Sequence, residues 1–231
     1  MTGDNPRHSQ IGLDRIVRLA WLEKTARLAL AGNSAQDTRT ILKQDLQATF
    51  PTSSADARGS LDKTVTVLAR VWLSAPSQQE SLRRRGLDLF IHLPQQDHVA
   101  LHWGMLLAVY PFWGAVALQV GRLLRLQGAA TAAQVQRRVR EQYGERETVA
   151  RRARYVLRSF VDWQVLKESD TKGVYTGATT KLIREPALTA WLVEAVLHTR
   201  PNGSAPLNEI FDNLSLFPFV LRQTSAAGLT V

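Results

Sequence analysis

Arginine is the residue type in this sequence whose placement points most clearly to chemistry. Ten arginines lie between residues 121 and 160, where there are only three glutamates. That window holds +7 of the formal net charge of +9, so the positive charge is concentrated in one part of the chain. A planar guanidinium group donates two parallel hydrogen bonds to a phosphate or to guanine. The cluster therefore predicts a surface that binds nucleic acid.

The pattern within this window separates a buried face from a binding face. In a helix predicted over residues 146–161, apolar side chains recur at helical spacing from Val149 to Phe160 and form one stripe. The polar side chains off that stripe are left to face solvent or a ligand. The predicted DNA contacts are Arg146, Thr148, Arg151, Arg152, Arg154, Tyr155 and Arg158 of this helix, Arg137, Arg138 and Arg140 of the preceding helix, and Lys167 and Lys172 of the following hairpin.

The elements that position these side chains follow one another in a recognisable order. Thr131 and Gln134 have the spacing of a capping box, which starts a short helix that Gly144 ends. The arginine-rich helix comes next, then a strand from Trp163, a turn at 169–173 and a returning strand. This order is typical of a winged helix-turn-helix, with its core motif at residues 115–178. In that motif the N-terminal half of the recognition helix contacts base edges. Here that helix is residues 146–161, and its N-terminal half includes Ala150.

Two other interpretations of the arginine cluster stay open. The arginines could form a solvated helix face that Glu141, Glu145 and Glu147 balance. They could also belong to a helical adaptor that binds protein partners and whose basic face is incidental. The coincidence of ten arginines with a helix-turn-helix pattern favours nucleic acid over both.

Other residue types give weaker evidence of a chemical function. His98 and His102 have the i, i+4 spacing of zinc ligands, but Val99 stands where a zinc peptidase needs glutamate, and the surroundings are apolar. We expect satisfied or surface histidines and no metal. The sequence contains no cysteine, which excludes disulfides and thiolate chemistry. It also lacks a Gly-rich phosphate loop, paired carboxylates in an apolar setting and a nucleophile elbow, so we expect no cofactor and no enzymatic activity.

The rest of the chain predicts a mostly α fold. A long helix is expected over residues 11–31, and the expected domains are an N-terminal helical domain (1–95), a winged helix-turn-helix domain (96–200) and a C-terminal appendix (201–231). Residues 99–120 carry no charge and are numerous enough to cross a bilayer. Because Tyr110-Pro111 divides them, we favour two core helices over a membrane span. The polar first ten residues are unlike a secretory signal, which favours a cytoplasmic protein.

The order of elements resembles the BrxA family of small helical proteins from bacteriophage-exclusion (BREX) defence systems. The resemblance rests on Ser53-Ser-Ala-Asp-Ala-Arg58, on Leu106-Leu-Ala-Val-Tyr-Pro-Phe112 and on Phe160-Val-Asp-Trp-Gln-Val-Leu166, in that order. It covers roughly residues 11–200 and has no counterpart for 201–231. It implies a non-enzymatic component that binds double-stranded DNA and works beside larger defence proteins. The resemblance and the arginine cluster together lead us to expect DNA binding mainly through phosphate contacts. The alternative is a helical adaptor that binds proteins, and a third, weaker hypothesis is a membrane-associated protein.

Overall fold

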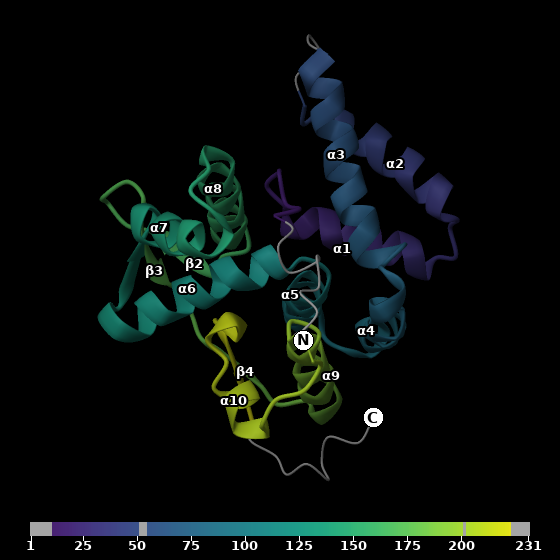
Figure 1. Cartoon of the computed structure of the whole chain (residues 1–231). Helices are drawn as coiled ribbons and strands as arrows, with labels where there is room; N and C mark the ends of the chain where they lie inside the picture. The colour runs from purple at the N-terminus through teal and green to yellow at the C-terminus, as the bar shows by residue number, and fades with distance from the viewer. Residues whose placement is uncertain (1–10, 51–54, 201, 223–231) are drawn as a thin grey trace.

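The computed structural model describes residues 11–50, 55–200 and 202–222, and this part of the chain is mostly α-helical (Figure 1). Residues 53 and 54 of the Ser53–Arg58 motif lie outside the described residues. The N-terminal half consists of α1 (Leu19–Leu30), α2 (Ala35–Gln47), α3 (Ala55–Trp72), α4 (Glu80–His92) and α5 (His98–Val109). The remaining helices are α6 (Pro111–Gln127), α7 (Ala132–Tyr143), α8 (Glu147–Asp162), α9 (Pro186–Leu197) and α10 (Leu207–Phe211).

Helix α5 lies at the centre of the fold. All twelve of its residues are buried, and it packs against α1, α3, α4, α6 and α9. A helix that is apolar on every face has to be covered on every face, because none of its sides can form favourable contacts with water. In Figure 1, α5 accordingly lies between the N-terminal helices and the group formed by α6, α7 and α8, and α9 lies below it.

The apolar run at residues 99–120 forms two helices, as predicted. Tyr110 is extended, Pro111 occupies the first turn of α6, and the helix axis bends by 117° between the two segments. Within the described residues, no single helix has both the length and the apolar character of a membrane span; this bent pair has them only when its two parts are counted together. Much of the run is buried within the protein.

Three short strands accompany α6, α7 and α8. They are β1 (Ala129–Thr131), β2 (Leu166–Glu168) and β3 (Val174–Gly177), and they form an antiparallel sheet in the order β1-β3-β2. The predicted capping box is confirmed at the start of α7. Thr131 Oγ1 accepts from the backbone N–H of Gln134 at 3.1 Å, and Gln134 Oε1 accepts from the backbone N–H of Thr131 at 3.0 Å. The sequence predicted the β2–β3 hairpin but not β1, which pairs with β3 from across two helices.

The C-terminal segment returns to the same core. The strands β4 (Lys181–Ile183) and β5 (Phe219–Leu221) pair in parallel, and a 3-10 helix at Leu214–Leu216 packs on α6. Trp103 of α5 donates through Nε1 to the carbonyl of Ser215 at 2.9 Å. Among residues 202–222 the buried ones are Ile210, Ser215, Leu216, Pro218, Phe219 and Leu221, and Ile183 of β4 is buried as well.

The expectation of a helix from residue 11 is wrong, because α1 begins only at Leu19. Residues 17–19, which we call the strap, bind the C-terminal end of α8 instead. The Val17 amide donates to Ser159 Oγ at 2.9 Å, and the Val17 carbonyl accepts from Trp163 Nε1 at 2.8 Å. The Leu19 amide donates to the Asp162 carboxylate at 3.0 Å. In a helix that began at residue 11, the backbone N–H and C=O groups of the strap would bond within that helix. Here they bond to α8 instead.

The end of α8 has an unusual residue in a left-handed conformation. Gln164 has a φ of 56°, and the bonds from its amide to the Val161 carbonyl and from the Val165 amide to the Phe160 carbonyl form a Schellman motif. Glycine normally takes this position, because a Cβ is unfavourable there. Among the described non-glycine residues, Gln164 alone has a positive φ.

Replacing Gln164 by glycine should therefore stabilise the protein. We expect Gln164→Gly to raise the free energy of unfolding by about 0.5–1 kcal/mol, the relief of left-handed strain less the added flexibility of the unfolded chain. The matched control is Gly128→Ala at the end of α6, where φ is 72° and a Cβ would meet no atom within 4 Å. That change should destabilise the protein for the same conformational reason. Denaturant unfolding measures both, and a loss of stability in Gln164→Gly would contradict the account.

Candidate nucleic-acid interface

The arginines of α8 lie on the face opposite its buried stripe. Glu147, Arg151, Arg154 and Arg158 recur at spacings of four, three and four residues, so they share one side of the helix, and all four are exposed. Thr148 is exposed beside this row, and Arg152 and Tyr155 are half-buried along its flank. The inward side consists of Val149, Ala150, Ala153, Val156, Leu157, Ser159 and Phe160.

The structure corrects one residue of the predicted reading half. Ala150 is only 1% exposed, because it extends the apolar stripe by one position and packs inward. It is therefore unable to contact a base edge. The other members of the N-terminal half, Arg146, Thr148, Arg151 and Arg154, are exposed.

Helix α7 packs against α8 and adds its own arginines to the surface. Arg137 and Arg138 are exposed, whereas Arg140 is half-buried. Arg146 lies in the turn between the two helices, where its guanidinium donates to the Tyr143 carbonyl at 3.1 Å. We call the surface formed by the arginines of α7, of this turn and of α8 the basic face.

A single carboxylate ties the two helices together on this face. Glu147 accepts from Arg140 at 2.9 Å and from Arg154 at 2.8 Å, one arginine on each helix. Arg138 lies 4.0 Å from Glu141. Among the described residues, five arginines of the basic face have no acidic partner: Arg137, Arg146, Arg151, Arg152 and Arg158. The sequence showed the acids, but not which arginines they would engage.

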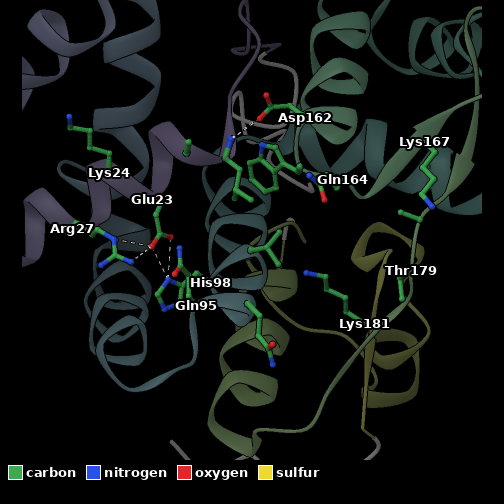
Figure 2. Close-up of a pocket in the computed structure, with 16 residues that line it drawn as sticks. Glu23, Lys24, Arg27, Gln95, His98, Asp162, Gln164, Lys167, Thr179 and Lys181 are labelled. Atoms are coloured by element: carbon green, nitrogen blue, oxygen red, sulfur yellow. Dashed lines mark hydrogen bonds and ion pairs between the residues drawn. The ribbon is translucent and has the colours of Figure 1, made fainter.

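The two predicted lysine contacts lie apart from each other in the hairpin. Lys172 is exposed in the turn between β2 and β3, which Glu168 closes by accepting from the Gly173 amide at 3.0 Å. Lys167 lies on β2 and lines a pocket that it shares with residues of α1 (Figure 2). The structure therefore places Lys172 at the tip of the hairpin and Lys167 at its base.

His98 and His102 form a buried network with Glu23 of α1. His98 Nδ1 lies 3.1 Å from Glu23 Oε1, and His102 Nε2 lies 3.1 Å from Glu23 Oε2. Trp72 donates through Nε1 to His102 Nδ1 at 2.9 Å. Because an indole N–H is a donor only, His102 Nδ1 is the acceptor, and the proton of the neutral ring lies on Nε2 and points at the carboxylate. Among the described residues, no group of three or more His, Asp or Glu is arranged to hold a metal ion.

This network shifts the ionisation of both partners. Burial lowers the pKa of His102 and outweighs the nearby carboxylate of Glu23, which opposes the shift. Burial alone would raise the pKa of Glu23, but the hydrogen bonds from His102, His98 and Arg27 together lower it to about 2. The folded protein thus keeps His102 neutral and Glu23 charged.

Comparisons with protein-family models, with curated proteins and with solved structures find no match to this chain.

The buried network makes acid destabilising. The pKa of His102 is lower in the folded than in the unfolded protein, so its contribution is complete above pH 6.5 and is lost as the pH falls below that value. We expect the free energy of unfolding to fall between about pH 7 and pH 5, with at most about 1.4 kcal/mol per pH unit from this one group.

A substitution isolates that contribution. His102→Gln should show a shallower decline over the same pH range, whereas His92→Gln, at an exposed histidine, should follow the wild-type protein. Denaturant unfolding at several pH values measures the slopes. Equal slopes in the wild-type protein and in His102→Gln would show that His102 is not the titrating group.

Proposed function

We propose that residues 111–177 form a winged helix-turn-helix that binds double-stranded DNA through the basic face. One observation carries the proposal: α6, β1, α7, α8, β2 and β3 follow in the winged-helix order, and unpaired arginines occupy the outer side of the helix that would enter the major groove. The β1-β3-β2 sheet order and the capping box at Thr131 support the same assignment.

The distribution of charge favours contacts with the phosphate backbone. The arginines come from two helices and from the turn between them, and phosphate contacts are the larger share of protein–DNA hydrogen bonds. Arg146, Thr148, Arg151 and Arg154 lie on the half of α8 that would enter the groove, where we expect their bonds to go mainly to the phosphates along its edges. Arg137 and Arg138 lie where flanking phosphates would be, and Lys172 where a wing approaches the backbone. The resemblance to the BrxA family extends the proposal to a phage-defence setting.

Removal of two arginines from α8 tests the proposal. Arg151→Ala with Arg154→Ala should weaken duplex binding for all sequences alike. The log–log dependence of affinity on salt should become less steep by about 2, because each substitution removes one bond to a phosphate. Neither side chain packs in the core, so the cost in stability should stay under about 0.5 kcal/mol each. Duplex affinity measured at several salt concentrations, together with the melting temperature, gives the result.

The matched control is Arg58→Ala with Arg84→Ala, which removes the same charge from exposed positions on α3 and α4. It should leave the affinity close to that of the wild-type protein. If the α8 variant melts normally and binds DNA like the wild-type protein, α8 does not bind DNA, and a helical adaptor becomes the better account.

Glu147 gives a prediction of the opposite sign. Glu147→Gln removes a negative charge from the basic face and releases Arg140 and Arg154, so DNA affinity should rise several-fold at low salt. Asp88→Asn on α4 makes the same charge change at an exposed position outside the basic face and should have little effect. Unchanged or weaker binding in a stably folded Glu147→Gln would mean that Arg140 and Arg154 do not meet DNA.

A further inference from the structure

A pocket of about 910 Å³ opens between the two halves of the molecule (Figure 2). Its walls come from α1, from the start of α5 and the two glutamines that precede it, from the end of α8, and from β2, β4 and the residues just before β4. This volume is within the range of sites that bind cofactors and nucleotide-sized ligands. Of the DNA contacts predicted from the sequence, Lys167 is the one that belongs to its lining.

The lining is positively charged, and its acids are already engaged. The lining includes four cationic residues, Lys24, Arg27, Lys167 and Lys181, and two carboxylates, those of Glu23 and Asp162. Glu23 is held by Arg27 and both histidines, and Asp162 is held by Arg18 at 3.2 Å and by the Leu19 amide. An incoming anion would therefore meet positive charge without having to displace either carboxylate.

Several polar groups of the lining have no partner among the described residues. Lys24 pairs with Asp45 and Arg27 with Glu23, whereas Lys167 and Lys181 form no ion pair there. The side chains of Gln95, Gln164 and Thr179 likewise make no hydrogen bond within this part of the chain. In Figure 2, Lys181 and Gln164 extend toward the same open space from opposite rims, while Lys24 points away from it.

Gln164 provides a separate reason to look for a ligand. Its left-handed backbone carries a cost that glycine would avoid, and the amide group of its exposed side chain makes no bond among the described residues that would offset this cost. A strained residue kept at the rim of a pocket is a reason to infer a function for its side chain. An amide at this place can donate to a phosphate oxygen.

We propose that this pocket binds a small phosphorylated heterocycle of nucleotide size. Its phosphate lies between the Lys181 ammonium group and the side-chain amide of Gln164, and Lys167, on the wall beside them, adds positive charge. Its body lies against Leu19 and Ala20 of α1, the more exposed apolar residues of the lining, and the side-chain amide of Gln95, also in the lining, can both donate and accept hydrogen bonds as base edges require.

Titration calorimetry of the full-length protein with ATP, inorganic triphosphate and adenosine tests the proposal. ATP and triphosphate should bind and compete with each other, and adenosine should bind more weakly. Lys181→Ala should lower ATP affinity at least tenfold, whereas Lys63→Ala, which removes an exposed lysine of α3 outside the pocket, should not. Gln164→Gly should lower ATP affinity several-fold while its melting temperature rises, which a merely structural role would not produce.

Further variants separate this site from the basic face. Arg151→Ala with Arg154→Ala should keep wild-type ATP affinity, and Lys181→Ala should keep wild-type duplex affinity. The pocket proposal is overturned by absence of ATP and triphosphate binding, or by ATP binding that the α8 variant abolishes and Lys181→Ala leaves intact. Loss of duplex binding in Lys181→Ala would also overturn the pocket proposal, because the pocket would then be part of the DNA-binding surface. Failure of DNA binding in the wild-type protein would leave the ATP result unaffected.

Discussion

The need to cover α5 on every side governs the arrangement of the other elements. A helix of twelve buried residues requires neighbours all round it, and here they come from both ends of the chain. Its two histidines add a second requirement, since a polar group without water needs a hydrogen-bonding partner. Glu23, Trp72 and the Leu93 carbonyl supply the partners, and in doing so they fix how α1, α3 and α4 meet α5.

Positive charge serves two distinct surfaces in this molecule. On the basic face it is dense and exposed, and Glu147 draws one arginine from each helix into a fixed position. In the pocket it is sparse, and the carboxylates nearby already hold other groups. The sequence gives the number of charges on the basic face and in the pocket but not which carboxylate pairs with which cation. Only the structure shows those pairs, and they are what distinguishes the two surfaces.

Elements with a local cause were predictable from the sequence. The apolar stripe of α8 and the Thr131–Gln134 box depend on residues within a few turns of one another, and the structure has both. Ala150 was misplaced because a small side chain at the border of a stripe gives no sign of its direction. The start of α1, the strand β1 and the pocket depend on partners far along the chain, such as Ser159 for Val17 and Tyr175 for Ala130. Local periodicity carries no information about such pairs.

The strap also has a consequence for the order in which the protein is made. Val17 and Leu19 leave the ribosome early, yet their partners Ser159, Asp162 and Trp163 are synthesised more than 140 residues later. During translation these backbone groups therefore stay hydrated or find temporary partners, and α1 acquires its final N-terminal boundary only after α8 exists. Closing a loop of this length delays the final step of folding. A ribosome-bound chain that stops before residue 159 would contain the N-terminal helices without the contacts that join them to the arginine-rich half.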